Sequence, residues 1–428
     1  MGTYEEGYMK SKRSRRKLGA VALPAILLLS LVLAACGSGG SSDSTEAAAS
    51  TESAETTEST DSTESTQSSE GEPTSAQEFS AYASEGGLSG AKTFLEEVQD
   101  ESSLEFSSYM PSAPETEVPA DKSVAIVICG SAAEGCVRGG EGAEAAAKAL
   151  GWKPEVYDGQ YNQNVESQAI SSAISKGADA IILVSIPPVA VGGAVQEALN
   201  AEIPVITTFI PGSPQEMDGV FADVSNGTFE GGLALASWIT VHSKGKARIV
   251  NNPDETSSLS VGRAAGVKAG LKEFCPECEI LEEVQDDPAH FTTKAPVIAS
   301  SAVQKYGTNN LYMVAPFDSA ATFLVQGAKE ANAPYFPIVS MDGNAEALKS
   351  IRNKEYIAAD WAGAMEWTGW AAIDQVIRAF NGEEPSGEEG SSVVPSLLID
   401  ETNLPKKEGN WIPSFDYEKA YEELWGVE

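Results

Sequence analysis

The chain has 428 residues, room for two or three ordinary domains, and its 42% hydrophobic and 7% aromatic residues are ordinary for a protein with a large core. Its formal net charge of −35 at pH 7 argues against a nucleic-acid partner, because an acidic surface repels a polyanion. The charge is uneven: residues 1–36 carry six Lys or Arg and two Glu, whereas residues 37–120 carry eighteen Asp or Glu and one Lys.

Residues 1–36 are predicted to be a lipoprotein signal peptide. A basic segment precedes an apolar run from Leu18 to Ala35, the order found in export signals. A membrane-spanning helix is the alternative, but Pro24 lies inside the run, which ends in the tetrad Leu33–Cys36. This tetrad resembles the lipobox of bacterial lipoproteins, in which the cysteine thiol receives the lipid. The resemblance implies export, by the general or the twin-arginine route. It also implies a lipid anchor on Cys36 at the outer face of the cytoplasmic membrane, in the periplasm or at the cell surface.

Residues 37–77 are predicted to be a disordered acidic tether of Ser, Thr and Glu. They contain no aromatic residue and no periodicity, so they cannot bury enough surface to offset the entropy of the chain. Roughly forty flexible residues reach about 35 Å on average. Residues 78–120 are predicted to be a partly helical lead-in, because Phe94, Leu95 and Val98 have helical spacing and prolines break up the segment that follows.

From residue 123 onward, buried-type strands alternate with helices. A first series has predicted strands at 123–129, 153–158, 178–186 and 203–210, and helices at 139–151, 164–177 and 191–202. A second series has predicted strands at 246–252, 278–285, 310–318, 336–343, 356–363 and 392–399, and helices at 227–243, 259–274, 294–307, 319–332, 344–354 and 365–382. This order implies parallel strands with helices on both faces of each sheet. The sequence therefore predicts an α/β protein with two lobes of about 110 residues facing each other across a cleft.

The four remaining cysteines form two close pairs in the sequence, Cys129 with Cys136 and Cys275 with Cys278. An even number of cysteines in an exported chain suggests disulfides, and pairing of sequence neighbours is the simplest of the three possible connectivities. A zinc site is the alternative for the second pair, but it needs further ligands, and neither His242 nor His290 has the required spacing. A redox pair would lie at the start of a helix, whereas this pair follows one. We therefore expect structural disulfides and no metal.

Motifs for cofactors and catalysis fail on their context. The series Gly140-x-Gly142-x-x-Ala145 has dinucleotide-binding spacing, but these glycines lie inside a predicted helix instead of at the end of a strand. The P-loop spacing that begins at Gly130 lacks the required Lys-Ser/Thr. There is no nucleophile elbow, and two histidines leave little material for a catalytic triad. We expect no cofactor and no enzymatic activity.

Open α/β sheets bind ligands at loops that follow the strands, so we take the candidate ligand-binding residues from those loops. They are Ser131, Arg138, Ser185, Phe209, Asp254, Phe317, Asp318, Asp342 and Trp361. Asp318 and Asp342 each precede a helix and could equally cap it, and the aromatic residues could equally be core. In a cleft, an aromatic ring would stack on a flat or apolar ligand face, while carboxylates would accept hydrogen bonds from hydroxyls or pair with cations.

Segments between residues 121 and 385 resemble, in order, the type I periplasmic binding proteins, and in particular the ribose-binding-like solute receptors of ABC importers. The matching segments include "EGAEAAAKALGWKPEVYDGQ", "AISKGADAIILVSI", "ADVSNGTFEGGLALASWI" and "VSMDGNAEALKSIRNKEYIAADWA". The resemblance implies two Rossmann-like lobes with parallel sheets, a three-crossover hinge near 221–226, 358–363 and 391–399, and a ligand cleft between the lobes. The N-terminal lobe would then comprise residues 121–225 and 361–390, and the C-terminal lobe with its tail residues 226–360 and 391–428.

The predicted pocket departs from the sugar-binding pattern of that family. This chain has Gly135-Cys136 in place of a stacking aromatic pair and Phe209-Ile210 in place of an Asp-Arg, and Phe317 replaces an Asn. The family's Gln after the returning crossover falls near Gly363, and Asp342 alone matches a hydroxyl-binding position. Each unpaired buried polar group costs about 1–3 kcal/mol, so an aromatic, less hydroxylated or modified compound fits at least as well as a sugar.

The resemblance thus implies a monomeric, lipid-anchored solute-binding protein that delivers a small molecule to an ABC permease. A receptor of the same fold that reports ligand occupancy to a membrane kinase is the first alternative. An enzyme with its site in the cleft is the second, and it would need an acid/base pair that the sequence does not show.

Overall fold

The computed structural model describes residues 79–80, 82–210, 214, 217–254, 258–387 and 390–427. All of them belong to the compact unit Ser75–Glu428. The predicted signal peptide, Cys36 and the tether lie outside the described residues. Within the described ranges, no helix combines the length and the apolar composition that crossing a membrane requires.

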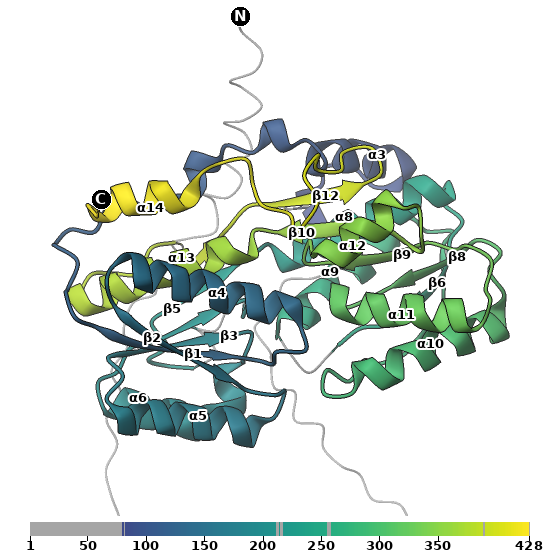
Figure 1. Ribbon diagram of the computed structural model, residues 1–428. Helices are drawn as coiled ribbons and strands as arrows, with labels where there is room; N and C mark the ends of the chain where they lie inside the picture. The colour runs from purple at the N-terminus through teal and green to yellow at the C-terminus, as the bar shows by residue number, and fades with distance from the viewer. Residues whose placement is uncertain are drawn as a thin grey trace, which may run out of the picture. The chain divides into compact units, whose positions relative to one another are not determined.

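The first lobe is built on a six-stranded sheet with the order β11-β5-β4-β3-β1-β2, in which every pairing is parallel. Its strands are β1 (Ser123–Ile128), β2 (Lys153–Asp158), β3 (Ala180–Val184), β4 (Val205–Thr208), β5 (Ala222–Ser225) and β11 (Ser391–Val393). Its helices are α4 (Glu134–Ala149), α5 (Gln163–Lys176), η3 (Pro188–Val191), α6 (Gly192–Asn200) and α13 (Met365–Asn381). Helices α4 and α13 pack together on one face, and α5 and α6 cover the other (Figure 1). Strand β3 is entirely buried because both faces are covered, as its uninterrupted apolar sequence predicts.

The second lobe has a six-stranded sheet with the order β12-β10-β9-β8-β6-β7, in which β12 alone is antiparallel to its neighbour. Its strands are β6 (Arg248–Asn251), β7 (Glu279–Glu283), β8 (Leu311–Val314), β9 (Ile338–Met341), β10 (Ile357–Gly363) and β12 (Ser396–Asp400). Its helices are α8 (Thr228–Ser243), α9 (Ser258–Phe274), α10 (Phe291–Tyr306), α11 (Asp318–Glu330) and α12 (Ala345–Arg352). The two sheets confirm the predicted α/β class with two lobes.

Two of the three crossings between the lobes lie a few residues from the expected boundaries. Strand β10 extends to Gly363, so Trp361 belongs to the second sheet and not to the first. Residues Ser391–Val393 pair with β5, so they belong to the first sheet and not to the second. The single strand expected at 392–399 is two strands in two sheets. It divides at Pro395, which has no N–H group to give to a ladder.

Helix α4 starts at Glu134, five residues before the expected start at residue 139. Gly142 allows a close approach to α13, because a Cβ atom there would lie 2.1 Å from the carbonyl oxygen of Glu366, and Gly140 packs against β1, where a Cβ atom would lie 2.6 Å from the side chain of Ile128. Both glycines therefore serve the packing of α4, and they lack the strand–turn–helix context of a dinucleotide motif.

The lead-in and the tail add elements outside the two sheets. Helix α3 (Gly87–Val98) buries Phe94, whose ring stacks on Phe274 of the second lobe with 5.8 Å between centroids. After η1 (Glu101–Ser103) and η2 (Phe106–Tyr109), the chain runs on to β1. Helix α14 (Tyr417–Trp425) packs on α13 of the first lobe, although residues 391–428 were expected to belong to the C-terminal lobe.

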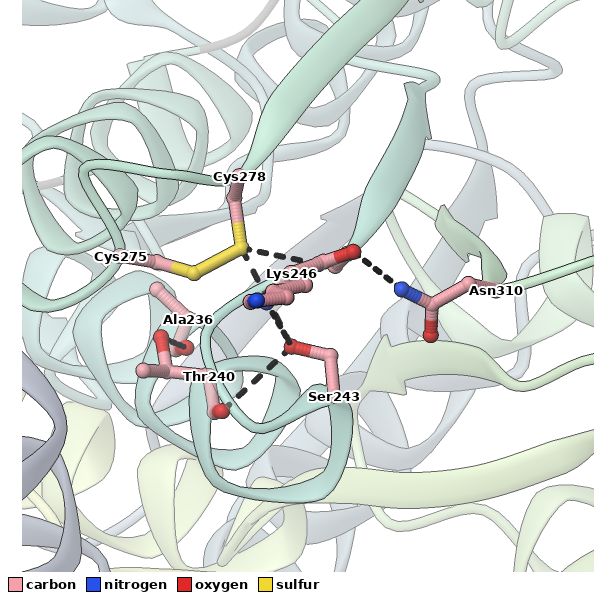
Figure 2. The surroundings of a disulfide bond; sticks show 8 residues. Ala236, Thr240, Ser243, Lys246, Cys275, Cys278 and Asn310 are labelled. Atoms are coloured by element: carbon pink, nitrogen blue, oxygen red, sulfur yellow. Dashed lines mark hydrogen bonds between the residues drawn. A yellow bond between two sulfur atoms is a disulfide. The ribbon is translucent and has the colours of Figure 1, made fainter.

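Both disulfides join sequence neighbours, Cys129 to Cys136 and Cys275 to Cys278. The second closes the end of α9 and lies beside the turn between α8 and β6, where Ser243 and Lys246 are found (Figure 2). There, the Sγ atom of Cys278 accepts a hydrogen bond from the backbone N–H of Ala247 at 3.2 Å. This disulfide therefore braces the second lobe at the edge of its sheet where β6 and β7 begin, opposite the edge where these strands end.

Candidate functional site

A cavity of about 240 Å³ lies between the lobes, where the parallel strands of both sheets end. Its polar lining residues come from both lobes: Tyr161, Gln163, Glu166 and Ser185 from the first, and Asp254, Ser260, Arg263, Asp287 and Asp342 from the second. Its apolar lining includes Phe209, Phe317, Met365 and the Cys129–Cys136 disulfide. Gly135 and the disulfide therefore form part of the cavity wall, at the position where the sugar-binding pattern has a stacking aromatic pair.

Five of the nine candidate residues line this cavity: Ser185, Phe209, Asp254, Phe317 and Asp342. Three of them follow their strands in a backbone conformation with positive φ, 56° at Ser185, 64° at Phe209 and 133° at Asp342. Non-glycine residues in this region store strain, and such residues concentrate at ligand sites.

The other four candidates do not line the cavity, because each has partners elsewhere. The hydroxyl of Ser131 donates to the carboxylate of Asp158 at 2.7 Å near the surface. The carboxylate of Asp318 accepts hydrogen bonds from the hydroxyl of Ser340 and, at 2.7 Å, from the backbone N–H of Asn344. Asp318 is therefore neither a helix cap nor a cavity residue, and it holds the loop that carries Asp342.

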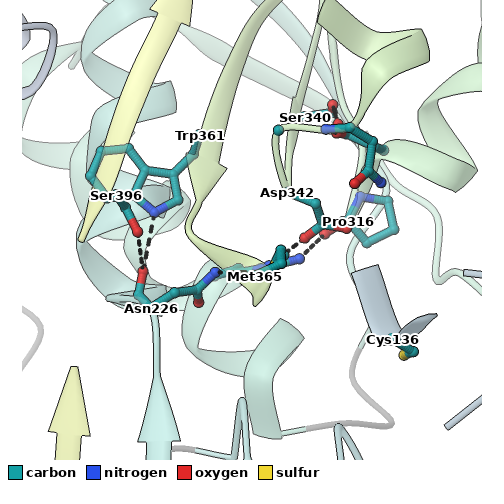
Figure 3. A network of polar contacts seen from close by, with 12 residues as sticks. Cys136, Asn226, Pro316, Ser340, Asp342, Trp361, Met365 and Ser396 are labelled. Carbon is teal, nitrogen blue, oxygen red and sulfur yellow. Dashed lines mark hydrogen bonds and ion pairs between the residues drawn. The ribbon is translucent and has the colours of Figure 1, made fainter. Parts of the chain in front are cut away.

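Trp361 lies at the hinge. Its indole N–H donates to the carbonyl of Asn226 at 3.4 Å, and the hydroxyl of Ser396 donates to the same carbonyl at 2.9 Å (Figure 3). Asn226, Trp361 and Ser396 belong to the three segments that pass between the lobes, so this carbonyl joins all three. The ring also packs against Gly231, where a Cβ atom would lie 2.5 Å from it.

Arg138 is a buried link between the lobes. Its guanidinium is paired with both carboxylate oxygens of Glu366, at 2.8 Å each. It also donates to the carbonyl of Asp342 at 3.0 Å, to the side-chain oxygen of Asn344 at 2.8 Å and to the carbonyl of Trp411 at 3.0 Å. All five N–H groups are used, so none remains for a ligand.

Arg263 is the lining residue that pairs with Asp342, and the sequence did not suggest it. Its Nη2 lies 2.7 Å from Oδ1 of Asp342, and its Nη1 donates to the carbonyl of Pro316 at 2.9 Å. Figure 3 shows Asp342 beside Pro316. Burial raises the pKa of Asp342, and the guanidinium opposes that rise. Asp342 is not the cap of α12, since Asn344 holds that position.

Tyr161 brings an aromatic ring into the cavity wall. Gly130 makes room for it, because a Cβ atom there would lie 2.6 Å from the ring. Burial raises the pKa of the Tyr161 hydroxyl, and Asp342 and Asp254 raise it further. The phenol therefore stays neutral and faces a negative environment.

Glu166 lines the cavity from the first turn of α5, whose N-cap is Asn162. The residue is 6% exposed, and Gly159 leaves space for its side chain, since a Cβ atom there would lie 2.6 Å from Cγ of Glu166. Burial raises the pKa of Glu166 to about 7. Within the described residues, its carboxylate has neither a hydrogen-bond partner nor an ion-pair partner.

Three acidic residues lie close together on the second-lobe side. Asp254 and Asp287 line the cavity. Asp286, which precedes Asp287 in the sequence, is buried. Burial, and then the charge of Asp254, raise the pKa of Asp286 to about 6. Asp287 instead pairs with Lys294, which lowers its pKa. Among the described residues, no group of three His, Cys, Asp or Glu side chains is arranged to hold a metal ion.

The sequence matches the family described as periplasmic binding protein domain over residues 124–384. Similar solved structures include an ABC transporter solute-binding protein from Agrobacterium vitis with bound allitol, which is 18% identical with a TM-score of 0.58 over 66% of this chain and 97% of that one. A sugar ABC transporter protein from Yersinia enterocolitica subsp. enterocolitica 8081 is 15% identical, with a TM-score of 0.62 over 72% and 95% of the two chains. A protein from Mycobacterium smegmatis in complex with β-D-fucofuranose is 16% identical, with a TM-score of 0.60 over 71% and 98%. At these identities the likeness establishes the fold. No curated protein matches the chain.

Proposed function

Because the chain belongs to the periplasmic binding protein family, as its sequence predicted, we propose that it is an extracytoplasmic solute-binding protein of an ABC importer. It captures a small molecule between its lobes and presents it to a membrane permease. The observation that carries this proposal is the cavity at the strand ends, which polar side chains of both lobes line. A ligand that contacts both walls stabilises the closed arrangement of the lobes over the open one.

The size and lining of the cavity favour a small, partly hydroxylated solute. A volume of about 240 Å³ is below the ordinary range of about 300–1,000 Å³ for small-molecule sites, which suits a ligand of monosaccharide size. Structures of similar fold hold allitol and β-D-fucofuranose. Phe209 and Phe317 add apolar surface that would contact a face of the ligand lacking hydroxyls.

We further propose that the protein is anchored to the membrane by lipid and has no catalytic activity. Multiple acylation at Cys36 would hold the protein at the membrane, since one acyl chain alone binds only marginally, and the acidic tether would let the lobes reach the permease. The protein would act as a monomer without a cofactor. The family and the solute-binding proteins of similar fold support a binding role without turnover.

A thermal-shift screen of the purified protein against sugars, polyols, aromatics and amines tests this function. A true ligand at 100-fold over its dissociation constant adds about 2.7 kcal/mol to the unfolding free energy. We expect at least one compound class to raise the transition temperature without being chemically changed. Chemical conversion of a stabilising compound, or the absence of any stabilising compound, would contradict the proposal.

A further inference from the structure

The cavity contains a buried carboxylate that the protein leaves without a partner. We propose that Glu166 forms an ammonium subsite on the first-lobe wall of the cavity, where its carboxylate pairs with a charged amino group of the bound solute. This inference rests on the proposed function, because it names a chemical class for the solute of the same cleft.

The burial of Glu166 is the first reason. Glu166 is 6% exposed as a residue, and an ionised carboxylate with so little access to water is costly unless a partner compensates it. Desolvation is the cause that raises its pKa, and no charged neighbour contributes to that rise among the described residues. This unpartnered carboxylate lies at a position that lines the cavity, where a bound solute can reach it.

The cations that line the cavity or contact its lining residues are the second reason, because each already has an acidic partner. Arg263 is paired with Asp342 at 2.7 Å, Arg138 with Glu366 at 2.8 Å, and Lys294 with Asp287. The cavity therefore offers no cation to Glu166 within the described part of the chain. When Glu166 is ionised, its compensating charge therefore comes from the bound solute.

The acidic character of the cleft as a whole, rather than of the immediate surroundings of Glu166, is the third reason. Asp254 adds a further carboxylate on the second-lobe side, and the acidic groups of the cleft help to raise the pKa of Tyr161. A neutral hydroxyl would donate one hydrogen bond to Glu166 and leave its charge uncompensated. An ammonium group would donate the bond and also neutralise the charge, and charge-assisted bonds of this kind are the stronger ones. A hydroxylated amine, such as an amino sugar or an amino polyol, combines this ammonium group with hydroxyls that can form hydrogen bonds with the other polar lining residues.

Matched pairs of compounds test the subsite. The probes are 1-amino-1-deoxy-D-glucitol against D-glucitol, and D-glucosamine against D-glucose, each titrated by calorimetry and by thermal shift. The proteins are the wild type, Glu166→Gln, which keeps the shape and removes the charge, and Glu166→Asp, which keeps the charge on a shorter side chain. Glu141→Gln is the matched control, because Glu141 is an exposed carboxylate on α4 outside the cavity.

We expect the amine of at least one pair to bind about tenfold or more tightly than its hydroxyl parent, since the charge-assisted bond is the stronger. This preference should persist in Glu141→Gln, weaken in Glu166→Asp and disappear in Glu166→Gln. The proposal is overturned if a neutral parent binds as well as its amine, if the preference survives in Glu166→Gln, or if neither amine binds. Binding of a neutral solute without an amine preference would leave the solute-binding function standing.

Proton release gives an independent readout. Since the pKa of Glu166 is near 7 in the free protein, a bound ammonium group would shift its titration towards the ionised form and release protons at neutral pH. Calorimetry in two buffers of different ionisation enthalpy should therefore find about half a proton released per bound 1-amino-1-deoxy-D-glucitol at pH 7. The release should vanish in Glu166→Gln. Equal release by both proteins would assign the proton to another group and contradict the proposal.

Discussion

At the scale of single residues, the buried pair of Arg263 and Asp342 determines the second-lobe wall of the cleft. The pair lies 2.7 Å apart with both side chains almost fully buried. Removing one partner leaves the other as an uncompensated buried charge, which costs about 3–5 kcal/mol. We therefore expect Arg263→Met to lower the unfolding free energy by about that amount in urea titrations.

The double variant Arg263→Met/Asp342→Asn is the control for this pair. It leaves no unpaired charge, so it should recover a large part of the lost stability. If the two substitutions instead add their separate costs, the pair does not act as a unit.

The titration of Glu166 gives a second prediction at this scale. Its pKa is about 7 in the folded protein, above the ordinary value of 4.5. The folded state therefore binds more protons than the unfolded state between these pH values, and the contribution of Glu166 to stability falls as pH rises through this range. Relative to the wild type, Glu166→Gln should gain about 1–2 kcal/mol of unfolding free energy between pH 5 and pH 8. Urea unfolding at both pH values measures this gain, and a constant difference between the two proteins would contradict it.

The cavity residues that the sequence predicted follow strands, whereas two that it missed lie within helices. Ser185, Phe209 and Asp342 follow strands directly, so the rule that ligands bind at strand ends found them. Glu166 and Arg263 lie within helices, where only the packing of the lobes decides which side chain reaches the cleft. For Glu166, an acidic residue in the first turn of a helix reads equally as a stabiliser of the helix dipole.

At the scale of elements, the apolar strands and the helical periodicity predicted the α/β order closely, because parallel strands buried on both faces give uninterrupted apolar runs. The ends of elements were less predictable. The start of α4 and the division between β11 and β12 depend on contacts with the other sheet and with α13, which adjacent residues do not encode.

The tail helix α14 is predicted to be part of the first lobe's stability. Trp425 stacks on Trp370 with 5.5 Å between centroids, and its indole N–H donates to Asp374 at 3.0 Å. We expect Trp425→Ala to lower the unfolding free energy by about 3 kcal/mol in urea titrations, as for a buried aromatic side chain. Lys419→Ala on the exposed side of the same helix should change it by less than about 0.5 kcal/mol. Equal effects of the two substitutions would show that α14 contributes no packing.

At the scale of the described unit, the lead-in and the tail connect elements of both lobes beside the hinge. Helix α3 packs on the second lobe, whereas the ring of Phe106 in η2 lies beside the ring of Trp367 of the first lobe, with 6.4 Å between centroids. The side chain of Asn403 in the tail donates to the carbonyl of Gln99 at 3.0 Å. The lead-in therefore contacts first the second lobe and then the first lobe.

Membrane attachment gives a prediction for the whole protein. Cys36→Ser should transfer the protein from the membrane fraction to the soluble fraction of the host, because the acylated thiol would be lost. Fractionation followed by immunoblotting measures this transfer. Retention of the variant in the membrane would assign the attachment to another segment.

We propose that a small solute binds between the lobes against Asp342. Titration calorimetry of the best compound from the screen tests it with the wild type, Asp342→Ala and Ser131→Ala, whose hydroxyl lies outside the cavity. We expect one solute per chain in the wild type and a loss of affinity of about tenfold or more in Asp342→Ala, since a charge-assisted contact would be removed, with unchanged affinity in Ser131→Ala. Unchanged affinity in Asp342→Ala would place the solute away from Asp342 and overturn this binding site.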